Sequence, residues 1–178
     1  MRFSLSALTA AVMLAPGVAE AQLISSRVAY VTFDDTRMLS ILDAVNSAEV
    51  RVANMAATQA KRQDVKDFAL MLVRDHELGQ VTVRDLARKF NATAYPLDTT
   101  MAVKRVIDDG TRLMGVTGDD FDAQWLDHQV VMHQAMIAAI DGEYPAAGQP
   151  AIRALVDQVK PTMELHLKRA KELRDIKP

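Results

Sequence analysis

The sequence has no cysteine among its 178 residues. Disulfide bonds, zinc–thiolate sites, iron–sulfur clusters and cysteine nucleophiles are therefore excluded. It also has no glycine-rich phosphate loop and no nucleophile elbow that would supply a Ser/His/Asp triad. The sequence on its own therefore does not predict an enzyme.

Aromatic residues and glycine are scarce: aromatics make up 5% of the chain, and there are 7 glycines. No segment alternates apolar and polar residues for long, so a β-sheet is not predicted. Residues 24–34 come nearest to such alternation, and we interpret them as an extended leader. The abundant Ala, Leu, Met and charged residues favour helices.

Neither sign of charge predominates, since the formal net charge is −2. This balance lacks the excess of positive charge that indicates binding to nucleic acid or to an anionic membrane. Beyond the N-terminal region, no apolar run approaches the length of about 18 residues that predicts a membrane-spanning helix. Two kinds of partner are compatible with the sequence: further copies of the same chain in a homo-oligomer, or another protein of the cell envelope.

The N-terminus is typical of a secretory signal peptide. Arg2 supplies a positive charge, residues 3–15 form a short apolar region, and Ala19-Glu20-Ala21 fits the small-x-small cleavage pattern. We therefore predict a Sec-type signal peptide over residues 1–21, an extended leader over residues 22–34 and a bundle domain over residues 35–178. The mature protein would be periplasmic or secreted.

Four long segments carry apolar residues at helical spacing. They run over residues 35–60, 64–90, 119–144 and 150–176. Asp64 is expected to cap the second helix, and Pro161 to kink or restart the fourth.

The second and third segments are joined by a long connection, residues 91–117, which carries a shorter predicted helix over residues 99–114. The pattern predicts an all-α fold: a ferritin-like four-helix bundle with a long crossover carrying a short extra helix. A helical-repeat array is the competing all-α fold, but the sequence shows no internal self-similarity.

Each long segment carries one ionisable residue inside its apolar stripe: Glu49, His76, His133 and His166. Counted from the two hairpin turns at a rise of about 1.5 Å per residue, all four lie at a similar depth. Three imidazoles and a carboxylate suit one transition-metal ion: zinc, iron or copper. The alternative is a buried Glu–His hydrogen-bond network that fixes helix register without a metal.

Three more residues are placed around this predicted site. His128 lies about 140° around the helix from His133 and is expected to be peripheral. Asp75 either orients His76 or faces solvent. Met163 is interpreted as core filler or a weak thioether ligand. Met163 also stands three residues before His166, where the usual di-iron motif requires Glu, so ferroxidase-type chemistry is not predicted.

Several motifs resemble the exported bacterial family called domain of unknown function 4142, which is placed in the ferritin-like superfamily. The resemblance lies in Ser47-Ala48-Glu49-Val50, in residues 68–69 and 71–76 (Met-x-x-x-Asp-His), in Gly118 and Phe121-Asp122 with His133 after them, and in Pro161 followed by His166. It covers about residues 35–174 and implies the fold and the export, but no activity.

Two functional hypotheses follow from the sequence. The first is an exported bundle that binds a metal ion through Glu49, His76, His133 and His166, for storage, sequestration or structural binding. The second is a non-enzymatic envelope or stress-related interaction protein in which the same residues form a structural network.

Overall fold

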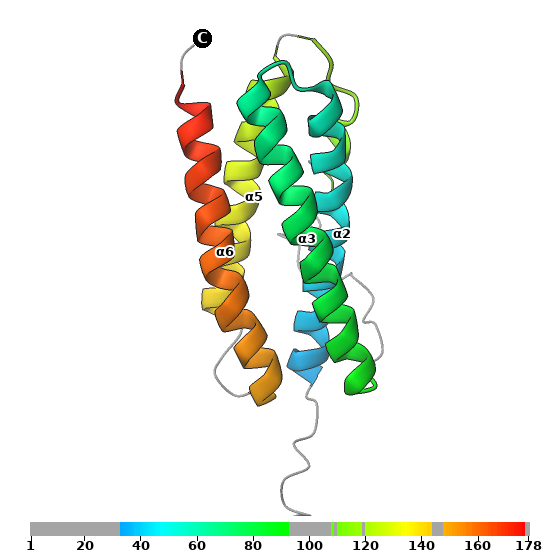
Figure 1. Ribbon diagram of the computed structural model, residues 1–178. Helices are drawn as coiled ribbons and strands as arrows, with labels where there is room; N and C mark the ends of the chain where they lie inside the picture. The colour runs from blue at the N-terminus through cyan, green and yellow to red at the C-terminus, as the bar shows by residue number, and fades with distance from the viewer. Residues whose placement is uncertain (1–32, 93–107, 109, 119, 144–147, 177–178) are drawn as a thin grey trace, which may run out of the picture. The chain divides into compact units, whose positions relative to one another are not determined.

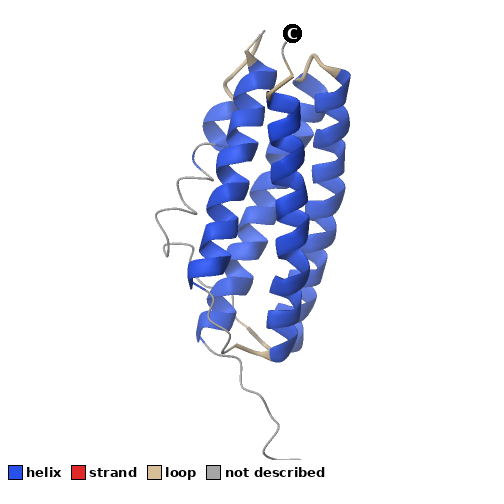
Figure 2. Cartoon of the chain, turned by 90° about the vertical axis from the view of Figure 1, so that its left-hand side faces the viewer, coloured by secondary structure: helices blue, strands red, loops and turns tan. Residues whose placement is uncertain are grey.

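The computed structural model describes residues 33–92, 108, 110–118, 120–143 and 148–176. Within these ranges the long elements are four helices: α2 (Phe33–Gln59), α3 (Gln63–Lys89), α5 (Phe121–Glu143) and α6 (Pro150–Arg174) (Figures 1 and 2). The all-α prediction is confirmed. None of the described helices is long and apolar enough to cross a membrane. The predicted signal peptide and most of the predicted leader lie outside the described residues.

The helices form two antiparallel hairpins, α2 with α3 and α5 with α6. The hairpins meet where α3 packs on α6 and α2 on α5. In Figure 1, α2 and α6 run upward and α3 and α5 run downward, so each helix is antiparallel to both of its neighbours. The end of α3 and the start of α5 lie at opposite ends of the bundle (Figure 1), as a crossover connection requires. Of the predicted crossover helix, residues 108 and 110–113 are helical, and the others before residue 110 lie outside the described ranges.

Two helix starts differ from the sequence-based prediction, and one of the two alternatives for Pro161 is excluded. Helix α2 begins at Phe33, within the predicted leader. Asp64 is not the N-cap of α3: that position is Arg62, and Asp64 pairs with the Arg62 side chain instead. Helix α6 continues through Pro161 without a restart, which leaves a kink as the predicted effect of the proline.

A buried aspartate from each hairpin binds the turn of the other. Asp122 in α5 accepts hydrogen bonds from the backbone N–H groups of Lys61 and Arg62, both at 2.9 Å, just before α3 begins. Asp35 in α2 accepts from the backbone N–H of Gln149, at 3.0 Å, just before α6 begins. These carboxylates satisfy N–H groups that precede a helix and also join the two hairpins at both ends.

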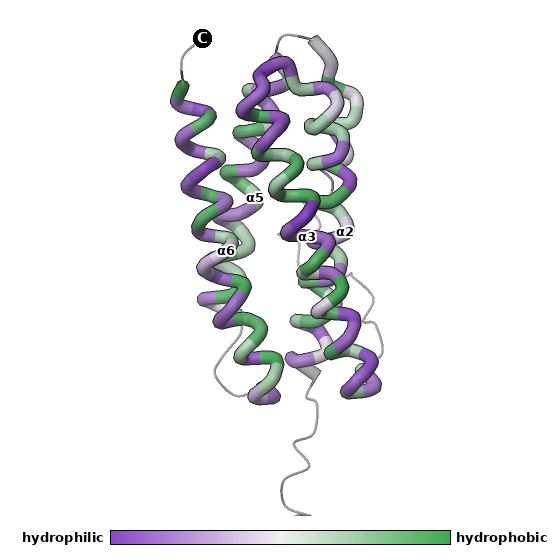
Figure 3. Tube along the Cα trace, viewed as in Figure 1, coloured by the Kyte–Doolittle hydropathy of each residue, from purple (hydrophilic) through white to green (hydrophobic). Residues whose placement is uncertain are grey.

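The apolar core is divided into two clusters along the bundle axis. One cluster joins the start of α2 and α6 to the end of α3 and α5, and includes Leu42, Val83, Met136 and Ile152. The other lies towards the opposite end and includes Phe68, Trp125 and Leu173. Figure 3 shows the same division in α3, where a hydrophilic stretch separates two hydrophobic ones. The polar residues predicted at mid-bundle lie between the two clusters.

The Asp122 contacts lead to a stability prediction. Replacing Asp122 with Ala leaves the N–H groups of Lys61 and Arg62 without their carboxylate acceptor, so the free energy of unfolding should fall by about 2–3 kcal/mol. Urea denaturation measures the change, with Asp127→Ala as a control at an exposed aspartate of the same helix. Equal stability of the two variants would contradict this role for Asp122.

Candidate metal centre

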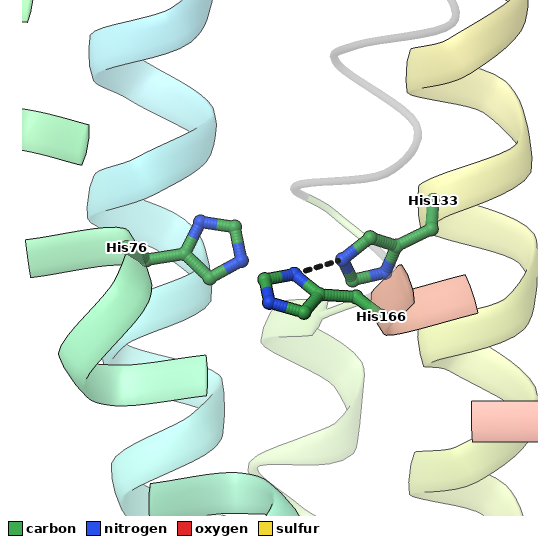
Figure 4. A group of neighbouring side chains, drawn as sticks. All are labelled: His76, His133 and His166. Carbon is green, nitrogen blue, oxygen red and sulfur yellow. Dashed lines mark hydrogen bonds between the residues drawn. The ribbon is translucent and has the colours of Figure 1, made fainter. Parts of the chain in front are cut away.

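Three of the four predicted inward residues meet at the centre of the bundle. His76 of α3, His133 of α5 and His166 of α6 each place one ring nitrogen within 4.8 Å of the others. We call these three residues the histidine cluster. Their exposed fractions are 5%, 1% and 1%, and Figure 4 shows the rings turned towards one another from three helices. Three convergent imidazoles at this separation form a ligand set of the kind that binds zinc, copper or iron.

The outer nitrogen of each imidazole is held by an acceptor. Nδ1 of His76 lies 2.8 Å from Oδ1 of Asn46, and Nδ1 of His133 lies 2.9 Å from the backbone carbonyl oxygen of Gln129. Nε2 of His166 lies 3.1 Å from Oδ2 of Asp75. The backbone carbonyl of Gln129 and the carboxylate of Asp75 can only accept, so the outer nitrogens of His133 and His166 donate their protons, and that of His76 donates to the amide oxygen that Asn46 turns towards it. This fixes the tautomers and directs the unprotonated nitrogens into the cluster, as in metal-binding histidines.

The inner nitrogens lack the partners that their lone pairs need. Nε2 of His133 and Nδ1 of His166 lie 3.3 Å apart (dashed in Figure 4), and the tautomers above leave no proton between them. Nε2 of His76 is buried without a hydrogen-bond partner. Two nitrogens bound to one tetrahedral zinc ion lie about 3.3–3.4 Å apart, given Zn–N bonds of about 2.0–2.1 Å. The His133–His166 pair is therefore already at the spacing that a shared metal ion requires.

Glu49, predicted as a fourth ligand, is buried at the same level but belongs to a different set of contacts. Its Oε2 accepts a hydrogen bond of 2.9 Å from the side-chain amide of Gln129. Its Oε1 lies 3.6 Å from Nε2 of His128. Burial raises the pKa of Glu49, but His128 and the nearby imidazoles lower it by more, to about 2. Glu49 is therefore an ionised carboxylate beside the histidine cluster.

The structure also places the three residues predicted to lie around the site, Asp75, His128 and Met163. Asp75 binds His166 across the α3–α6 contact, so its partner is not the adjacent His76. The side chain of His128 is 7% exposed and faces Glu49, outside the histidine cluster. Met163 is buried in the apolar cluster that includes Leu42.

Two residues of the centre were not predicted from the sequence. Asn46 and Gln129 hold the outer nitrogens of His76 and His133. The available signal was spacing: Asn46 stands three residues before Glu49, and Gln129 stands four before His133, so each shares a helical face with a predicted ligand. Gly79 makes room for Asn46, because a Cβ at that position would lie 3.1 Å from Asn46 Oδ1.

All three histidines of the cluster favour the neutral form. Burial lowers the pKa of His76 to about 4 and that of His133 to about 3, and it also lowers the pKa of His166. The carboxylates of Glu49 and Asp75 oppose this effect without overcoming it. A neutral imidazole is the form that binds a metal ion, so protons compete weakly for these nitrogens near neutral pH.

The comparisons with known proteins place the chain in a family. The family described as "Domain of unknown function (DUF4142)" matches residues 21–173. The chain belongs to this family, as its motifs predicted. No curated protein and no solved structure matches the chain.

The lowered histidine pKa values predict acid sensitivity of the metal-free protein. Unfolding returns each histidine to a pKa of about 6.5, so below that pH the unfolded state binds more protons than the folded state. The free energy of unfolding should therefore fall as pH drops from 6.5 towards the folded pKa values of about 4 and 3, by about 1.4 kcal/mol per pH unit for each fully shifted histidine.

Urea denaturation between pH 7 and pH 5, in the presence of a chelator, measures this dependence. His133→Gln should reduce the slope by about one proton. A stability independent of pH over this range would show that the histidines are not buried in the neutral form.

Proposed function

We propose that the chain is a metal-binding protein whose histidine cluster holds one transition-metal ion: zinc, iron or copper. The observation that carries the proposal is the set of three buried inner nitrogens, which converge within 4.8 Å with their outer nitrogens bound to acceptors. A lone pair buried without a partner costs free energy, and a metal ion would satisfy all three.

Storage, sequestration or structural binding suits this centre better than catalysis. Three protein ligands leave a coordination position for water or another ligand, as in catalytic zinc sites. The histidine cluster, however, is buried between two apolar clusters. The metal would then join three helices from both hairpins and stabilise the folded state by its binding free energy.

The second candidate is a non-enzymatic envelope protein in which these residues form a structural network. It is favoured by the contacts of Glu49, whose carboxylate is bound by Gln129 and faces His128. The unpartnered Nε2 of His76 and the facing nitrogens of His133 and His166 argue for the metal, because a purely structural network would satisfy them.

Metal content distinguishes the two candidates. Elemental analysis of the protein purified from the periplasm should find about one transition-metal ion per chain. His133→Gln should reduce that content at least tenfold because it removes one of three ligands. His128→Gln is the matched control, since it removes a buried histidine of the same helix outside the cluster. Equal metal content in the two variants would favour the structural network.

The proposal includes export and a ferritin-like arrangement. The two hairpins, with α3 ending and α5 beginning at opposite ends of the bundle (Figure 1), support the ferritin-like topology. The predicted signal peptide supports export, as does the family match, which begins at residue 21 beside the predicted cleavage site.

Export predicts a processed N-terminus. Intact-mass measurement of the protein from the cell envelope should give a chain that begins near Gln22. Deletion of residues 2–21 should retain the protein in the cytoplasm. A chain that keeps Met1 and still fractionates with the periplasm would contradict a cleaved signal peptide.

A further inference from the structure

Two carboxylates lie beside the histidine cluster without being part of it. Glu49 is 2% exposed, and Asp75 accepts a hydrogen bond from the His166 ring. The three imidazoles themselves carry no charge when their inner nitrogens are free to bind metal. A cation in the cluster would therefore meet neutral ligands and two nearby negative charges.

We propose that the histidine cluster selects divalent over monovalent cations, because the carboxylates of Glu49 and Asp75 place negative charge beside three neutral ligands. This inference rests on the proposed function. Coulomb attraction to a carboxylate is proportional to the charge of the ion, so both carboxylates favour a dication over a monovalent ion at the same position, Asp75 less than Glu49 because it is paired with Arg74.

Among the described contacts of Glu49 there is no lysine or arginine to neutralise its charge. Its Oε2 accepts a hydrogen bond from Gln129, whose side-chain amide is uncharged. Its Oε1 faces Nε2 of His128 at 3.6 Å, and that nitrogen has no hydrogen-bond partner in the described structure. A buried carboxylate held in this way acts on a neighbouring cation with little screening by solvent.

Asp75 should contribute less than Glu49. Its side chain is 22% exposed and also pairs with Arg74, whose own side chain is 75% exposed. Water and the arginine therefore screen part of its charge. The structure assigns the larger share of the selectivity to Glu49.

Coulomb energy is proportional to the product of the charges, which separates a charge effect from a structural one. Removing a carboxylate charge should change the logarithm of the affinity for a dication about twice as much as that for a monovalent ion. Loss of packing or of ligand orientation has no such dependence on ion charge. The ratio of the two changes is therefore the diagnostic quantity.

Glu49→Gln is the sharpest variant because it keeps the shape of the side chain and an oxygen acceptor for Gln129. The full chain is titrated with Co²⁺, followed by its visible absorption, and then with Ag⁺, followed by displacement of Co²⁺ from the same site. We expect Glu49→Gln to weaken Co²⁺ binding at least tenfold and Ag⁺ binding by about the square root of that factor. Asp75→Asn should give a smaller loss with the same ratio, and it serves as the test variant if Glu49→Gln does not fold.

The matched control is Asp127→Asn on α5, at a carboxylate that is 66% exposed and pairs with Arg174. It should change either affinity less than twofold. If Glu49→Gln weakens both ions by the same factor, or neither, the carboxylate does not act by charge and the inference is overturned. If the wild-type chain binds neither ion, the proposed function itself fails.

Discussion

Three buried imidazole nitrogens face one another at the centre of this bundle, and their lone pairs have no hydrogen-bond donor among the described residues. Asn46, Asp75 and the carbonyl of Gln129 fix the outer nitrogens as donors, so the inner ones cannot supply protons to the cluster. Facing lone pairs repel unless a cation lies between them. A metal ion relieves this repulsion and binds α3, α5 and α6 to a common point.

The rest of the fold keeps this polar layer in place. Apolar clusters on both sides exclude water and supply most of the packing energy. At the two ends, Asp35 and Asp122 bind the turn of the opposite hairpin, which fixes the axial position of one hairpin against the other. Because the histidines come from both hairpins, that position determines whether their nitrogens converge. The aspartate contacts at the ends and the cluster at the centre are thus parts of one arrangement.

Helical periodicity was sufficient to predict the four helices and the histidine cluster, since ionisable residues inside apolar stripes must lie in the interior. Glu49 was expected among the ligands because its depth along the bundle matched that of the histidines. Depth along a helix does not determine lateral distance, however, and the Glu49 carboxylate is bound by Gln129 beside the cluster. Asp75 was considered with its neighbour His76, but adjacent helical positions point about 100° apart, and it reaches His166 on another helix. The partners of Asp122 are in another hairpin, and no local pattern predicts them.

Anomalous diffraction from crystals of the full chain soaked with Zn²⁺, collected at the zinc absorption edge, tests the central claim most directly. The account predicts one peak inside the bundle, about 2.0–2.1 Å from Nε2 of His76, Nε2 of His133 and Nδ1 of His166. Full zinc occupancy at surface carboxylates with no peak among these three nitrogens would contradict it.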